Sequence, residues 1–415
     1  MNDNATDFER VIGLDAHPDS FTAALLQGRT PAQAIVQRVF NKVCLSRLAT
    51  WAQQHTHPQD LIVLKASGNS FQIVRRLAAI QRRALVLESA HLGKLKEAHA
   101  NNDRISAVRI AKAYLAGTAK TVWVPDPVTQ ERRDWYHAHR KAVKRTTQMR
   151  ARLKSYLSDN GVRLKKGTPL TEPEIAHKQL RQLKDWSPRQ WQVIEGLLME
   201  LQHAEAQRQH WRRLIAQEVL NDPLLLSLVR LCGVRDLIAF AIGAIIGDIG
   251  RFAKPRSLVN FVGLTPAFDD SGEGCWRGGV AFHGRKDLRS LLVEAAQSIL
   301  RSKEPLAKWG KKLMARKSSM KLAVAAVARK LAVAIWYLLH GRWTPLEELD
   351  ERLVLKVGKV ITHLGAKGLK ATGKTRKTLR EQAYQTLRHG RTYLLEPVRK
   401  FVPKPKPQTP APAQA

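Results

Sequence analysis

The feature that most constrains the fold is a change in the spacing of apolar residues along the chain. Over roughly the first 125 residues, short apolar runs with the length of buried strands alternate with segments whose apolar residues recur every three or four positions. The expected strands are residues 10–15, 21–26, 34–40, 61–64 and 84–87. The expected helices are residues 45–54, 71–80 and 103–115.

The order of these elements indicates an α/β domain, which we place at residues 8–125. Three strands in hairpin order, followed by strands that alternate with helices, are typical of a ribonuclease-H-like layer. Flavodoxin-like folds alternate in a similar way, so the order by itself leaves both folds open.

The chain becomes helical and strongly charged over residues 126–221. Gly161 and residues 167–173 divide this region into at least two helices. The apolar spacing allows two interpretations, a helical hairpin packed on its neighbour or a coiled-coil arm for dimerisation. A mainly α domain with a Gly-rich centre is expected to follow at residues 222–342, with long helices at 288–301 and 321–339.

Residues 343–415 are expected to form a basic appendage with a disordered tail. From Glu351 onward the chain holds 15 Lys and Arg against 3 Glu, an excess that favours a solvated segment. Residues 402–415 are rich in Pro, Ala and Gln, a composition that cannot bury enough apolar surface to fold.

The net charge of +35 predicts a polyanionic partner, and nucleic acid is the commonest one. An anionic membrane is the competing partner, but the most apolar run found, residues 237–249, is shorter than the ~20 residues a bilayer requires. The N-terminus lacks the order of a signal peptide, and the three cysteines form no metal-binding or disulfide pattern. We therefore expect a cytoplasmic protein without a membrane partner.

Two aspartates lie at positions that suit metal ligands, one at the end of an expected strand and one at the start of an expected helix. Asp15 ends the first expected strand, where a carboxylate projects from the sheet edge and can hold a hard cation such as Mg²⁺. Asp103 heads an expected helix. Each has a purely structural alternative, a turn or cap for Asp15 and a helix N-cap for Asp103.

Two sets of motifs in order resemble a known family. The first set is VIGLDAH, KASGNSF, NNDRISAVRIA and TVWVP, and the second is GLTPAFDDSG and HGRKDLRSLLVEAA. Together, over residues 10–342, they resemble the DEDD/serine transposases of bacterial insertion sequences, a family that includes the Piv-type DNA invertases. The resemblance implies a RuvC-like first domain, Mg²⁺ or Mn²⁺, a nucleophilic serine in the C-terminal domain, and a nucleoid-associated bacterial setting. It also implies element-end and target DNA, a structured guide RNA, and a homo-oligomer, dimer or tetramer, as partners.

The acidic half of the family pattern is only partly present. Asp15 matches the first family acid and Asp103 the third, and both would be metal ligands. The second acid is replaced by Lys65, which cannot ligate a metal while charged, and the fourth by Ser106, which can still bind through a metal-bound water. Glu88 is a candidate replacement carboxylate. The alternative is that Glu88 lies at the sheet edge in solvent and has no role in the site.

Ser271 matches the family nucleophile, although a Ser-Gly pair by itself is usually only a turn. Gly272 would let the backbone approach a phosphodiester closely, and nearby cations would neutralise it. The expected phosphate-binding cations are Arg277, Arg285, Lys286 and Arg289.

The main hypothesis is cleavage and exchange of element DNA strands by the metal site and Ser271 acting together. They would act across subunits, because the two motifs lie far apart in the sequence. A second hypothesis is a decayed copy that binds nucleic acid without catalysis, favoured by Lys65 and Ser106. A third is a RuvC-like junction nuclease, which would share the first domain but not the serine domain.

Overall fold

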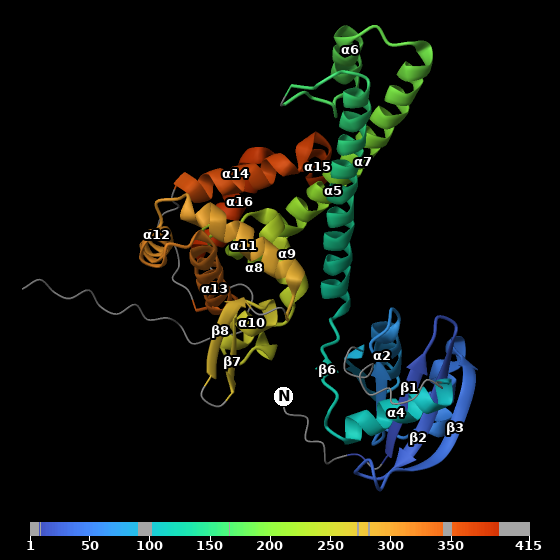
Figure 1. The fold of residues 1–415 in the computed structure, drawn as a ribbon. Coiled ribbons are helices and arrows are strands. Elements are labelled where there is room, and N and C mark those ends of the chain that lie inside the picture. Colours follow the sequence, from blue (N-terminus) through green and yellow to red (C-terminus); the bar gives the residue numbers. More distant parts are fainter. Residues whose placement is uncertain are drawn as a thin grey trace, which may run out of the picture. The chain divides into compact units, whose positions relative to one another are not determined.

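A computed structural model describes residues 8, 10–89, 102–165, 167–271, 274–280, 283–342 and 351–389, without the side chains of 267–280 and 389. The chain divides into two compact units, Met1–Asp126 and Pro127–Ala415 (Figure 1). We describe each unit separately. The boundaries expected inside the second unit, after residues 221 and 342, stay predictions.

The first unit is built on a six-stranded mixed sheet, which agrees with the α/β class that the sequence predicted, while the ribonuclease-H-like assignment stays a prediction. Its strands are β1 (Arg10–Ala16), β2 (Ser20–Gln27), β3 (Ile35–Cys44), β4 (Leu61–Lys65), β5 (Arg83–Leu87) and β6 (Thr121–Val122). They lie in the order β3-β2-β1-β4-β5-β6, with β1, β4 and β5 parallel and the other neighbours antiparallel. The short strand β6 was not expected.

Helices cover both faces of this sheet. They are η1 (Leu45–Arg47), α1 (Leu48–His55), α2 (Ser70–Ala78) and α4 (Asp103–Leu115), the last with its predicted bounds. Alternate residues of β1 serve the two faces, because successive side chains of a strand point to opposite sides. Val11 packs in the cluster that contains α4, whereas Ile12 and Leu14 pack with α1 and α2.

Gly13 lets α4 lie directly against β1. A Cβ atom at this position would stand 1.9 Å from the carbonyl oxygen of Ala107, closer than any real contact. Asp15 is two residues further along β1 and therefore faces the same helix. The close approach of α4 thus places the end of β1 beside the first turns of that helix.

The second unit begins with a helical arm. It consists of α5 (Pro127–Asp159), α6 (Pro173–Leu183) and α7 (Pro188–Asn221), and Figure 1 shows α5 and α7 running side by side. Leu153 and Leu157 of α5 share a fully buried cluster with Leu198 and Leu201 of α7. The arm is therefore a helical hairpin within one chain, and the coiled-coil dimerisation arm stays a prediction.

The body of the second unit is mainly helical, as expected, but it contains an unexpected β-hairpin. Its helices are α8 (Pro223–Leu228), α9 (Asp236–Ile246), η2 (Ile249–Arg251), α10 (Pro255–Val262), α11 (Lys286–Leu300), α12 (Pro305–Lys317) and α13 (Met320–Leu339). The hairpin pairs β7 (Pro266–Ser271) with β8 (Gly274–Val280) in the Gly-rich centre. Glycine weakens a strand pattern, which explains why the sequence did not predict the hairpin.

Helix α13 bears on the prediction that the chain has no segment long and apolar enough to span a membrane. By length and composition it is the one described helix that is long and apolar enough to cross a bilayer, a candidate that the search of residues 237–249 missed. However, 61% of its apolar window is buried inside the fold. It lies in the same core cluster as α9 and α11, so its apolar character has a structural explanation.

The expectation that residues 343–415 form an appendage is wrong for residues 351–389. They form α14 (Glu351–His363), α15 (Gly365–Thr372) and α16 (Arg376–His389), which pack on α7 and α8. The buried residues of this segment that join the main core are Leu353, Val357, Val360, Ile361, Leu364, Leu379, Ala383 and Leu387. Their three- and four-residue spacing was masked by the cations on the solvent faces. Residues 390–415, which include the expected disordered tail, lie outside the described part of the chain.

Candidate metal site and serine hairpin

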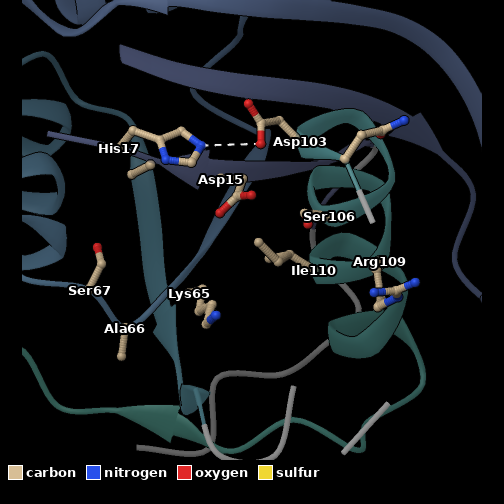
Figure 2. Close-up of a pocket in the computed structure, with 11 residues that line it drawn as sticks. Asp15, His17, Lys65, Ala66, Ser67, Asp103, Ser106, Arg109 and Ile110 are labelled. Atoms are coloured by element: carbon tan, nitrogen blue, oxygen red, sulfur yellow. Dashed lines mark ion pairs between the residues drawn. The ribbon is translucent and has the colours of Figure 1, made fainter. Parts of the chain in front are cut away.

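A polar pocket of about 370 Å³ lies where β1 and β4 end, beside the start of α4 (Figure 2). The two strands are parallel neighbours, with Leu14 opposite Leu64, so their carboxyl ends meet at one sheet edge. Asp15 and Lys65 enter the pocket from these ends. The helix contributes Asp103 and Ser106, which lie one turn apart on the same face.

The start of α4 is capped by Asn102 and not by Asp103. The Asn102 side chain accepts a hydrogen bond of 2.9 Å from the backbone N–H of Ile105. Asp103 is instead the first residue of the helix, so the N-cap interpretation of this aspartate is wrong. Its carboxylate lines the pocket, and Figure 2 shows it beside His17.

His17 completes a set of groups that suits a divalent cation. The ligand atoms of Asp15, His17 and Asp103 all lie within 4.8 Å of one another. The His17 Nε2 atom lies 3.4 Å from Asp103 Oδ1, yet it is buried and has no hydrogen-bond partner among the described residues. Two carboxylates and an imidazole nitrogen that makes no hydrogen bond within the described residues fit a metal such as Mn²⁺.

Sequence reasoning missed His17, although a signal was present. His17 follows Asp15 by two residues, the spacing that places two side chains on the same side of an extended chain. Arg109 was missed as well, and it lies on α4 one turn after Ser106 and also lines the pocket.

The environment of the pocket disfavours the charged form of Asp15. Burial raises the pKa of Asp15, and Asp103 raises it further. His17, Lys65 and a hydrogen bond from Ser106 act in the opposite direction, but the pKa remains above its ordinary value. A bound cation would favour the charged carboxylate and reverse this shift.

Glu88 is not brought into this site. It follows β5, it is exposed to solvent, and it is not among the described residues that line the pocket. Its backbone N–H donates to the carbonyl of Lys120 over 2.9 Å. The structure therefore gathers Asp15, Lys65, Asp103 and Ser106 without Glu88.

The candidate nucleophile Ser271 is the last residue of β7, at the tip of the hairpin. It pairs with Gly274 of β8. Gly272 lies outside the described residues, and the side chains of Ser271 and Arg277 are not described. Their catalytic and phosphate-binding roles therefore stay predictions.

The base of the hairpin requires two glycines whose backbones lie in close contact. Gly263 (φ +77°) and Gly284 (φ +90°) both have a left-handed backbone that favours glycine. A Cβ atom on Gly263 would stand 2.1 Å from the carbonyl oxygen of His283, and one on Gly284 would stand 2.6 Å from the nitrogen of Gly263. These glycines of the GLTP and HGR motifs are thus required by packing.

Two of the predicted phosphate-binding cations already have protein partners. Arg289 Nη1 donates to the carbonyls of Gly263 (3.0 Å) and His283 (3.2 Å), and so links the two segments at the base of the hairpin. Arg285 donates to both carboxylate oxygens of Asp287, at 3.1 and 2.7 Å. Lys286 is exposed at the start of α11. Arg289 therefore supports the hairpin base, and the Arg285 side chain is held by Asp287 of α11, whatever else these two cations bind.

Residues 227–309, which include this hairpin, match a model of the family described as "Transposase IS116/IS110/IS902 family". The chain is 25% identical to the transposase for insertion sequence element IS1111A of Coxiella burnetii, over 68% of this chain and 78% of that protein. It is 25% identical to "Putative transposase y4qE" of Sinorhizobium fredii, over 56% of each chain. It is 28% identical to "Probable family 20 transposase" of Pseudomonas aeruginosa, over 36% of this chain and 45% of that protein. The alignments with the last two therefore span only about half the length of each relative.

Proposed function

We infer that this protein is a transposase of the IS116/IS110/IS902 kind, which binds DNA and cleaves and rejoins its strands. The observation that carries this inference is the match of residues 227–309 to that family of transposases. The match lies outside the α/β unit, so it favours a transposase over a junction nuclease that would share only the first unit. The sheet order of that first unit supports a RuvC-like, ribonuclease-H-like domain.

The first unit would supply the metal site. Asp15, Asp103 and His17 would hold Mg²⁺ or Mn²⁺, which when bound polarises a phosphate oxygen and stabilises developing charge. Lys65 lines the same pocket and would place its ammonium group against the negatively charged phosphate. Ser106 would orient Asp15 through its hydrogen bond.

The second unit would supply the nucleophile. The hydroxyl oxygen of Ser271 would form a bond to phosphorus while the bond from phosphorus to a DNA oxygen breaks, and that oxygen would leave with a proton. The phosphoserine link conserves the energy needed for rejoining. Gly272 would permit close approach of the DNA backbone, with Arg277 and Lys286 as phosphate contacts.

The partners follow from this proposal. Element-end and target DNA would be the substrates, and a structured guide RNA would select the target. A homo-oligomer would bring the metal site of one subunit to the serine of another, in a cytoplasmic, nucleoid-associated setting. The net charge of +35 supports the polyanionic partners.

The test is to trap the covalent adduct on nicked element-end DNA in the presence of Mg²⁺. We expect an adduct with the unaltered protein and none with Ser271→Ala. Ser290→Ala is the matched control, because Ser290 is an exposed serine of α11 whose hydroxyl only donates to the carbonyl of Asp287. An adduct that persists in Ser271→Ala would refute the role of the serine.

A catalytically inactive, DNA-binding copy is the second candidate, and one observation favours it. Lys65 and Ser106 line the metal pocket at the positions where the related pattern has acids. Lys65→Glu and Ser106→Asp restore those acids singly. If this copy is inactive, the restored variants should excise element DNA faster than the starting protein, and equal excision would exclude the idea.

A further inference from the structure

A second pocket, of about 560 Å³, lies in the second unit among α5, α7, α9 and α14. Six of the residues that line it have side chains with nitrogen atoms: His139, Arg208, Gln209, Arg212, Arg213 and His363. No carboxylate is among the described residues that line it. Figure 1 shows α14 and α15 beside the arm helix α7, where this pocket lies. It is separate from both the metal pocket and the serine hairpin in the residues that form it.

The arginines of this pocket carry more charge than the nearby carboxylates neutralise. Arg208 is paired with Glu205 at 2.9 and 2.5 Å, and Arg212 with the buried Asp236 at 2.8 Å. Arg213 has no hydrogen bond or ion pair with any part of the chain that the structure describes. One guanidinium group therefore remains without a counter-charge at a site that three arginines share.

His139 is the observation that points to a ligand. Its side chain is only 3% exposed, yet neither ring nitrogen has a hydrogen-bond partner among the described residues. Burial, together with the charges of Arg212 and Arg208, lowers the pKa of His139 to about 4. The ring is therefore neutral near pH 7 and offers one N–H donor and one acceptor, which buried polar groups rarely leave unused.

His363 is held in position by the same buried carboxylate that binds Arg212. Its Nδ1 lies 2.7 Å from Asp236 Oδ2, so Nδ1 carries the proton and donates to this carboxylate. Arg212 Nη2 donates to the other oxygen of the same carboxylate. Asp236 thus fixes His363 and Arg212 from behind, and a ligand would meet a rigid set of groups.

We propose that this pocket binds a phosphate group of a nucleic-acid backbone, held by Arg213 and Arg212 with His139 as a neutral donor. Planar guanidinium groups match the oxygen pairs of a phosphate, and a neutral imidazole donates without adding charge. The pocket volume is within the range of ordinary ligand sites. The inference concerns binding alone and does not depend on the strand chemistry proposed above.

The first experiment measures binding of a fluorescein-labelled stem-loop, made once as DNA and once as RNA, by fluorescence anisotropy with the full chain. Arg213→Gln should weaken binding about tenfold and reduce the slope of log affinity against log salt by about 0.7 to 0.9. Arg189→Gln is the matched control, because Arg189 is an exposed arginine of the same helix outside the pocket. A larger loss with one of the two oligonucleotides identifies the source of the phosphate, and equal effects of both variants would overturn the proposal.

The second experiment asks whether His139 meets the ligand, with inorganic phosphate as the probe. The His139 ring resonances should shift on phosphate addition in the unaltered protein and in Arg189→Gln, but not in Arg213→Gln. Circular dichroism before each titration verifies that the variants are folded. If His139 does not respond to phosphate in the unaltered protein, the assignment of this histidine is wrong.

Discussion

The two pockets of this molecule differ in the charges that line them: the metal pocket of the first unit has both carboxylates and cations, whereas the pocket of the second unit, here called the basic pocket, has no carboxylate among its described lining residues. The metal pocket gathers Asp15 from a strand end and Asp103 from a helix start, with Lys65 and Arg109 beside them, and burial raises the pKa of its Asp15. The pocket of the second unit gathers Arg208, Arg212 and Arg213 and has cationic charge to spare. The first is suited to a cation and the second to an anion, so each should respond to changes that leave the other unaffected.

The largest effect is expected from Asp236→Asn, which removes the carboxylate behind the basic pocket. Burial by itself would raise the pKa of Asp236, but the hydrogen bond from His363 and the charge of Arg212 hold this pKa below its ordinary value. The substitution should lower the free energy of unfolding of the second unit by about 3 kcal/mol at pH 7. Chemical denaturation measures this loss, with the exposed Asp185→Asn as control.

The pH dependence of this loss has a defined sign. Because the folded pKa of Asp236 is depressed, its contribution is complete above about pH 4, the ordinary range of an unfolded aspartate. The contribution disappears as the pH falls through the lower folded value. The difference between Asp236→Asn and the unaltered protein should therefore shrink below pH 4, and a constant difference would show that the ionised carboxylate is not the cause.

The next effect is expected from Gly13→Ala, which should disrupt the metal pocket alone. The added Cβ would clash with the carbonyl of Ala107 and push α4 away from β1. Overpacking of this kind should destabilise the first unit by about 2 kcal/mol. Gly68→Ala is the control, since no atom lies within 4 Å of its added Cβ. Phosphate titration of His139 should be unchanged in Gly13→Ala, and a change would mean that the two pockets are not independent.

The smallest effect concerns the choice of metal. His17→Ala should weaken Mn²⁺ binding about tenfold and Mg²⁺ binding less, because an imidazole nitrogen suits Mn²⁺ better than Mg²⁺. Asp15→Asn should weaken both. Calorimetric titration measures the affinities, with Ser67→Ala as a control at the pocket edge. Equal losses for both metals in His17→Ala would exclude His17 as a direct ligand.

The metal pocket was largely predictable because regular structure determines it. The ends of parallel strands meet at one edge, so Asp15 and Lys65 had to be neighbours once the strands were identified. Ser106 follows Asp103 by one helical turn, which fixes their common face. His17 was missed, since it lies just beyond the expected strand, and so was Arg109, which lies one helical turn after Ser106.

The basic pocket could not be predicted from local patterns. Arg212 and His363 meet through Asp236, and these residues come from three helices that lie far apart in the sequence. The same limitation applies to α14 and α16, whose apolar residues were outweighed by the surrounding cations, and to the hairpin, whose glycines argue against strands. Such features depend on long-range packing, which spacing and composition do not encode.

The packing of α14–α16 on α7 and α8 limits where the chain can be truncated without exposing its core. A fragment that ends at residue 342 would leave apolar surface of the main core open to water, because Val357, Leu364 and Leu387 would be lost from it. It would also lack His363, and with it one wall of the basic pocket. Fusion partners and affinity tags therefore belong after residue 389, and a recombinant C-terminal domain should include all three helices.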